Sequence, residues 1–173
     1  MKGSIVCCLH DMVAAKSDAG TWKRILDGAG VEPGRMFLPT DDLEDKAAMA
    51  LIESTCKTMN LSLPEAADAF GHYWMTVYAP TVYKAYFTGT DSAKAFLEKM
   101  DRVHKMATRN IAGAHPPRFG CQRVDDKTLV MTYNSPRGLI DVMVGLIKGV
   151  GAYYHEELRV EKLPGSRVKV VFP

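Results

Sequence analysis

The strongest constraint on the fold is a change in the spacing of apolar residues part-way along the chain. Up to Gly113, apolar residues recur at three- and four-residue steps, in segments bounded by capping residues, glycines and prolines, which is the pattern of helices. After it, Arg118–Arg123 and Thr128–Ser135 alternate in the manner of strands. We therefore expect an α+β chain: a helical N-terminal half, then a mixed half with a small antiparallel sheet.

The expected helices of the first half cover residues 5–16, 21–29, about 40–59, 62–77 and 93–110, with a further turn at 83–87. The clearest start is Ser62-Leu63-Pro64-Glu65, where Ser62 can cap, Pro64 fits the first turn and Glu65 completes a capping box. We expect Pro80 to break the helix that follows. In the second half we expect a helix at 138–154 and strands at 158–162 and 167–172.

Composition indicates one ordinary globular domain, 1–173. Hydrophobic residues make up 47% of the 173 residues and charged residues 24%, and the net charge is +2. So small a charge excess provides no electrostatic case for nucleic acid as the main partner. The apolar runs are too short to span a membrane, and the first residues lack the apolar core and cleavage site of a signal peptide, so we expect a cytoplasmic protein.

Common catalytic and metal-binding motifs are missing from the sequence. It contains no catalytic triad pattern, no P-loop, no dinucleotide fingerprint and no CxxC spacing. No two of the five histidines lie four residues apart on one expected helix. The four cysteines, Cys7, Cys8, Cys56 and Cys121, are expected to be reduced thiols, most of them packed as small hydrophobic residues.

The segment Tyr133-Asn134-Ser135-Pro136-Arg137 carries one candidate binding site. If it is extended, Tyr133, Ser135 and Arg137 point to one face, about 6–7 Å apart. Two hydroxyls beside a guanidinium suit an anion with more than one carboxylate, such as the two propionates of a haem. Taken alone, the segment is a weak signal, because a strand that ends at a Ser-Pro turn and leaves its arginine exposed has the same pattern.

His104 is the second candidate. It lies near the apolar stripe of the expected 93–110 helix, whose members are Phe96, Leu97, Met100, Val103 and Ala107. A lone helical histidine is commonly a surface or core residue. It becomes a candidate haem ligand when an apolar slot and an anchor for carboxylates come from other elements of the same chain.

A series of short motifs runs along nearly the whole chain. In sequence order they are Met1-Lys2-Gly3-x-Ile5-Val6, Trp22, Phe70-Gly71-x-Tyr73-Trp74, Phe96-Leu97-x-x-Met100-Asp101-x-Val103-His104, Pro117, Phe119-Gly120-Cys121, Tyr133-x-Ser135-x-Arg137 and Gly145-Leu146-Ile147-x-Gly149. In these motifs the chain resembles the H-NOX (haem–nitric oxide/oxygen binding) family. Pro117 follows His104 by 13 residues, the spacing found in the family. Together the motifs are specific, although each alone is not.

The resemblance implies a haem b held between a distal helical subdomain, about 1–60, and a proximal subdomain with helices and the small sheet, about 61–173. His104 would be the axial ligand of the iron, with Met100 on the same helix also contacting the haem. Tyr133, Ser135 and Arg137 would hold the propionates, and Pro117 would press the porphyrin out of planarity. The residues implied to line the haem and its gas ligand are Ile5, Leu9, Trp74, Val142 and Leu146.

One position departs from the dioxygen-binding members of the family. They carry a distal tyrosine five residues after the signature arginine, where this chain has Val142. Bound dioxygen is polarised and needs a hydrogen-bond donor, whereas nitric oxide and carbon monoxide need none. Trp74 could donate its indole N–H, or it could simply pack against its neighbours. We therefore expect a sensor that binds nitric oxide and carbon monoxide and excludes dioxygen.

The resemblance also implies how such a domain signals. Nitric oxide would weaken or break the Fe–His104 bond, the haem would flatten against Pro117, and a partner would sense the movement. Possible partners are a histidine kinase, a cyclic-dinucleotide enzyme or a chemotaxis receptor. Two alternatives stay open: a haem enzyme such as a peroxidase or a nitric oxide-consuming oxygenase, for which His10 and His72 are the distal candidates, and a domain that binds no haem.

Overall fold

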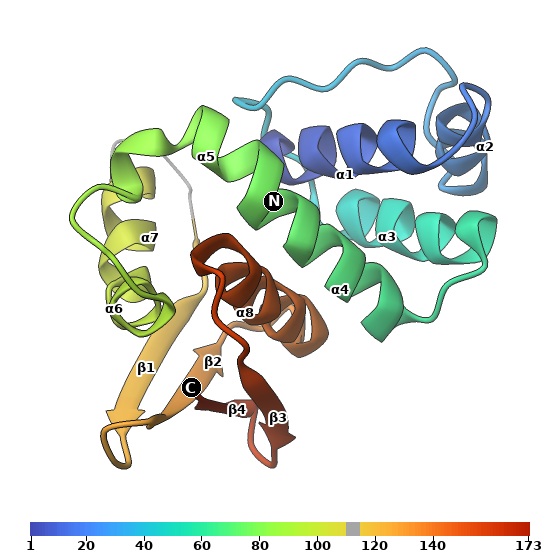
Figure 1. Cartoon of the computed structure of the whole chain (residues 1–173). Coiled ribbons are helices and arrows are strands. Elements are labelled where there is room, and N and C mark those ends of the chain that lie inside the picture. Colours follow the sequence, from blue (N-terminus) through green and yellow to red (C-terminus); the bar gives the residue numbers. More distant parts are fainter. Residues whose placement is uncertain (110–114) are drawn as a thin grey trace.

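The structure is a computed structural model that describes residues 1–109 and 115–173 (Figure 1). Two expectations lie outside these residues: the end of the 93–110 helix and the change of pattern at Gly113. Within the described part, no helix combines the length and the apolar character needed to cross a membrane.

The N-terminal helices are α1 (Gly3–Lys16), α2 (Thr21–Gly28) and α3 (Asp45–Met59). We expected the third helix to begin near residue 40, but it begins five residues later. The preceding residues are used elsewhere: the backbone N–H of Gly3 donates to the carbonyl of Asp41 at 2.8 Å, and Lys2 forms a β-bridge with Asp42. The 40–44 segment therefore joins the chain N-terminus instead of extending the helix.

Helix α4 (Leu63–Tyr73) starts with the expected capping box, which is confirmed by bonds between Ser62 and Glu65 in both directions. It continues into a π-helical turn, η1 (Trp74–Tyr78), then α5 (Ala79–Val82) and a 3-10 turn, η2 (Lys84–Tyr86). The expected break at Pro80 is wrong. Pro80 lies in the first turn of α5, where a missing backbone donor is tolerated, and the helix adjusts one turn earlier through η1.

The expected single helix 93–110 is divided in two, α6 (Ala93–Glu98) and α7 (Met100–Thr108). Lys99 separates them with a ψ of −4°, outside the usual helical range. Its ammonium group bonds to the hydroxyl of Thr90 at 3.1 Å, which ties the junction to the chain before α6. The helix that carries His104 is therefore a short element with its own direction.

The second half contains β1 (Arg118–Arg123), β2 (Thr128–Asn134), α8 (Ile140–Tyr154), β3 (Arg159–Leu163) and β4 (Arg167–Val171). The strands form one antiparallel sheet in the order β1-β2-β4-β3. Helix α8 lies between the sheet and α4, and α6 and α7 lie beside β1 (Figure 1). The expected α+β fold is confirmed.

Buried side chains form two cores. The N-terminal core consists of Val6, Cys8, Leu9, Met12, Val13, Ile25, Leu26, Leu51, Phe70 and Tyr78. The C-terminal core is built from the sheet, α6 and α8, with Met75 from η1. Trp74 and Leu146 are half-buried and pack against both cores. The candidate site lies along this junction, where several apolar side chains are only partly covered.

Candidate functional site

His104 is held by its own helix in a defined orientation. Its Nδ1 lies 2.9 Å from the carbonyl oxygen of Met100, one turn earlier on α7. A carbonyl only accepts, so Nδ1 carries the proton and donates, and Nε2 keeps its lone pair. Burial lowers the pKa of His104, which favours the neutral ring. A neutral imidazole with a free Nε2 is the form that binds a metal.

Strand β1 also holds the His104 ring in place, through Phe119. The ring of Phe119 meets it edge-on, with ring centroids 4.9 Å apart. The Asp101 carboxylate, one turn before His104, accepts two bonds from Arg118 at 2.6 and 2.7 Å and one from the backbone N–H of Phe119 at 3.1 Å. These bonds hold the pKa of Asp101 well below its usual range, and the Arg118 guanidinium makes the largest contribution. Any movement of α7 is thereby coupled to the start of β1, next to Pro117.

The Tyr133–Arg137 segment is extended only as far as Asn134, the last residue of β2. Tyr133 is 7% exposed, belongs to the C-terminal core and lies 6.1 Å from Phe119 between ring centroids. Pro136 and Arg137 form a turn, and the backbone N–H of Arg137 donates to the hydroxyl of Ser135 at 3.4 Å. The expected single extended row is therefore correct for Tyr133 but not for the whole segment.

Arg137 already binds a carboxylate, which is the kind of group expected for it. Its Nε donates to a carboxylate oxygen of Asp45 at 2.9 Å, and its Nη1 donates to the carbonyl oxygen of His115 at 2.8 Å. Asp45 stands at the start of α3 and also bonds to the N-terminal ammonium at 3.1 Å. The bond from Arg137 is the main cause that lowers the pKa of Asp45. A guanidinium that holds a carboxylate here is suited to a propionate.

The residues implied to surround the gas ligand come from three elements and meet in space. Ile5 and Leu9 lie on α1, Trp74 on η1, and Val142 and Leu146 on α8. Leu9 is 6% exposed and belongs to the N-terminal core. The other four side chains are half-buried and pack against that core. The structure therefore brings together side chains up to 141 residues apart in the chain, from Ile5 to Leu146.

Two further residues of this region were not expected from the sequence. Asp45 is one, through its bond to Arg137. Tyr78 is the other: its ring lies 5.2 Å from that of Trp74, and its buried hydroxyl has no hydrogen-bond partner. Only its four-residue spacing from Trp74 placed it near the same helical face, which is a weak signal.

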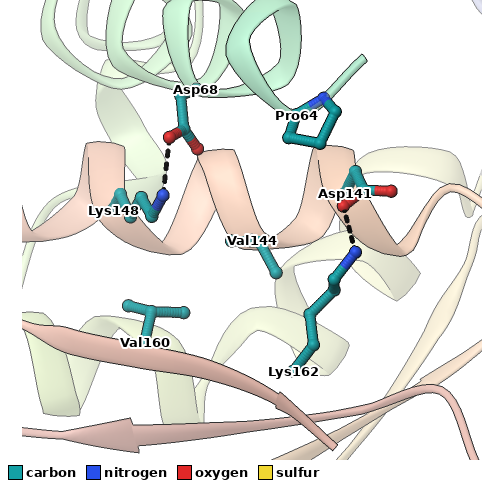
Figure 2. A pocket seen from close by; sticks show the side chains of 7 residues that line it. All are labelled: Pro64, Asp68, Asp141, Val144, Lys148, Val160 and Lys162. Atoms are coloured by element: carbon teal, nitrogen blue, oxygen red, sulfur yellow. Dashed lines mark hydrogen bonds and ion pairs between the residues drawn. The ribbon is translucent and has the colours of Figure 1, made fainter. Parts of the chain in front are cut away.

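A surface depression elsewhere carries no comparable chemistry. It lies between α4, α8 and β3 and is lined by Pro64, Asp68, Asp141, Val144, Lys148, Val160 and Lys162 (Figure 2). Its charges are already paired, with Lys148 bonded to Asp68 at 2.5 Å and Lys162 to Asp141 at 2.6 Å. These ion pairs link the three elements, and none of the candidate haem residues takes part.

Comparison with known proteins decides the family. A family model described as HNOB, Haem-NO-binding, matches residues 2–162. The chain belongs to the haem-NO-binding (H-NOX) family. Members of this family are haem-binding gas sensor domains and not enzymes, which confirms the expected class of protein and excludes the enzyme alternatives.

Solved H-NOX domains agree with the fold over 99% of this chain. A Cs H-NOX mutant that carries 4-cyano-L-phenylalanine is 26% identical, with a TM-score of 0.87 and 96% of that chain covered. An oxygen-binding H-NOX domain related to soluble guanylate cyclases, solved as its oxygen complex, is 28% identical, with a TM-score of 0.83 and 95% covered. The H-NOX fold is thus the fold of this chain.

A curated relative, soluble guanylate cyclase gcy-32 of Caenorhabditis elegans, is 22% identical over 154 residues. The match covers 87% of this H-NOX chain and 22% of the cyclase. The chain therefore spans about a fifth of the length of that relative.

Proposed function

We propose that this H-NOX domain senses nitric oxide through a haem b whose iron is bound by His104. The observation that carries the proposal is the orientation of His104. Its Nδ1 donates to the carbonyl of Met100 at 2.9 Å, which fixes the tautomer and leaves Nε2 for the iron. Phe119 packs against the ring, and burial lowers the pKa of His104, which favours the neutral ring. When bound, the haem supplies an iron centre for diatomic ligands.

We propose that Arg137 binds a haem propionate, with Ser135 and Tyr133 completing the anchor. Arg137 is the strongest member, since its side chain is 18% exposed and already binds a carboxylate. The Asp45 carboxylate occupies the guanidinium in the way proposed for the propionate. When haem is present, Asp45 and the propionate would share the guanidinium of Arg137. Met100 and Pro117 lie on either side of His104 in sequence and are proposed to contact the porphyrin.

We propose that the pocket favours nitric oxide and carbon monoxide over dioxygen. Ile5, Leu9, Val142 and Leu146 are apolar and cannot donate a hydrogen bond to a polarised ligand. One solved relative binds oxygen. The resemblance to the family implies a tyrosine in its dioxygen-binding members at the position that Val142 occupies in this chain. The preference thus follows from the apolar lining near Val142.

We propose that the signal starts with the release of His104 from the iron. Release frees α7, and the bonds from Asp101 to Arg118 and Phe119 carry its movement to the start of β1. Ligand binding can shift a conformational equilibrium in this way because the two states differ in a specific contact. The proposed receiver is a cytoplasmic signalling protein, such as a histidine kinase, a cyclic-dinucleotide enzyme or a chemotaxis receptor.

The ligand assignment is tested by His104→Gly. We expect the ferrous variant to lose the spectrum of a histidine-bound haem and to regain it when imidazole is added. His155→Gly is the matched control, because His155 is exposed and has a φ of 57°, which glycine adopts readily. A His104→Gly protein with an unchanged haem spectrum would show that another residue binds the iron.

A further inference from the structure

The hydroxyl of Tyr78 is buried without a partner. Tyr78 is 7% exposed, and its oxygen is the only buried side-chain nitrogen or oxygen in residues 1–109 and 115–173 that makes no hydrogen bond. Burying such a group costs free energy unless a bond compensates for it, and native proteins satisfy nearly all of them. The position of this hydroxyl therefore needs an explanation from function.

Tyr78 lies beside the proposed gas-binding pocket. It ends the π-helical turn η1, a kind of turn that recurs at functional sites, and its ring is tilted against Trp74 at 5.2 Å. It shares the N-terminal core with Leu9, and Ile5, Val142 and Leu146 pack against that same core. The Tyr78 side chain thus belongs to the core against which the residues of the proposed distal pocket pack.

The surroundings of the hydroxyl leave it available as a donor. Burial raises the pKa of Tyr78, and the nearby Cys7, Tyr83, Cys8 and Asp11 raise it further, so the hydroxyl stays protonated. Cys7 instead donates to the carbonyl of Phe37 at 3.3 Å.

We propose that Tyr78 is a selectivity-determining residue whose hydroxyl donates a hydrogen bond to the diatomic ligand on the distal side of the haem. The proposal rests on the proposed function and refines it. Val142, on α8, offers no hydrogen-bond donor to the ligand. Tyr78, on η1, supplies one. A polarised ligand such as dioxygen gains more from this bond than nitric oxide or carbon monoxide. Tyr78 therefore limits how strongly the otherwise apolar pocket disfavours dioxygen.

The direct test is the infrared spectrum of the carbon monoxide complex of Tyr78→Phe, with Tyr86→Phe as the matched control. Tyr86 lies on η2, one ring beyond Tyr83. We expect the carbon–oxygen stretch to move to higher wavenumber in Tyr78→Phe alone, and dioxygen affinity to fall roughly 2- to 12-fold, the effect of one neutral hydrogen bond. An identical stretch in Tyr78→Phe and wild type would overturn the proposal.

A second measurement does not depend on haem. In the haem-free chain, Tyr78→Phe should unfold at the same or a higher temperature than wild type, because the lost hydroxyl had no partner within the protein. A clearly lower unfolding temperature would mean that the hydroxyl bonds to the protein itself and would overturn the proposal. The two ideas can fail separately. If wild type failed to bind haem and Tyr78→Phe still unfolded at the same or a higher temperature, the proposed function would be wrong, but the Tyr78 hydroxyl would still be unpartnered.

Discussion

Arg137 links the two halves of the proposed binding site. Its guanidinium joins the turn after β2 to Asp45 of α3 and to the carbonyl of His115. Because the folded pKa of Asp45 is lowered, this contact is present above the ordinary carboxyl pKa of about 4 and is lost as the pH falls through the lowered value. The ion pair is therefore intact throughout the neutral range.

We expect Arg137→Ala to weaken haem retention by about 1.5–3 kcal/mol, the scale of a bond to a charged group. Asp45→Asn should leave retention unchanged or improve it, because the neutral side chain competes less for the guanidinium. The rate of haem transfer to a haem-scavenging protein measures both. Arg102→Ala, which removes an exposed arginine from α7, is the control. Wild-type retention in Arg137→Ala would remove the propionate role.

At the scale of elements, the crossing of α4 and α8 sets the distance between the two cores. A Cβ atom on Gly71 would lie 2.1 Å from the backbone carbonyl carbon and oxygen of Gly145, and one on Gly149 would lie 2.2 Å from the carbonyl oxygen of Gly71. Only glycine lets these two helices approach so closely. The close approach places Trp74 of η1 and Leu146 of α8 at the junction of the cores.

We expect Gly71→Ala to destabilise the domain by about 1–3 kcal/mol, since the added methyl group must displace backbone and not a mobile side chain. Gly34→Ala is the matched control, because a Cβ there meets nothing within 4 Å. The free energy of unfolding in urea measures both variants. Equal stabilities would show that α4 and α8 can separate at little cost, contrary to the tight crossing.

At the scale of the whole molecule, we expect the signal from the haem to move the two cores relative to one another. They meet at Trp74 and Leu146 and are also linked by the ion pair of Arg137 with Asp45. His104 and Pro117 lie on the C-terminal side, whereas Ile5 and Leu9 lie on the N-terminal side. A haem held between them would transmit a change of its own shape to both cores at once.

We expect Pro117→Ala to flatten the haem without any ligand and to move the free protein part of the way to its signalling state. The reason is that the proline ring is proposed to hold the porphyrin out of planarity. Crystal structures of wild type and Pro117→Ala with haem measure the distortion, and the nitrosyl absorption spectrum reports whether His104 is released. A haem equally distorted in both proteins would contradict the role of Pro117.

Local patterns in the sequence determined much of this architecture. Helical spacing, the Ser62–Glu65 capping box and the alternation in two later segments predicted the α+β order, because these signals depend on neighbours a few residues apart. The motifs around His104 and Tyr133–Arg137 predicted the family. Local signals failed at residues 40–44, which pair with the distant chain N-terminus. They also failed at Lys99, whose side chain bonds to Thr90, nine residues earlier.

Only the tertiary structure decided how the candidate site is assembled. Arg137 and Asp45 are 92 residues apart, and no local pattern indicates that one holds the other. The edge-on contact of His104 with Phe119 required β1 to lie beside α7. Tyr78 is an ordinary tyrosine in the sequence, and its hydroxyl became a candidate donor only once the packing of the N-terminal core left it buried and unpaired. Pairing and burial are properties of distances in space, which the order of residues does not specify locally.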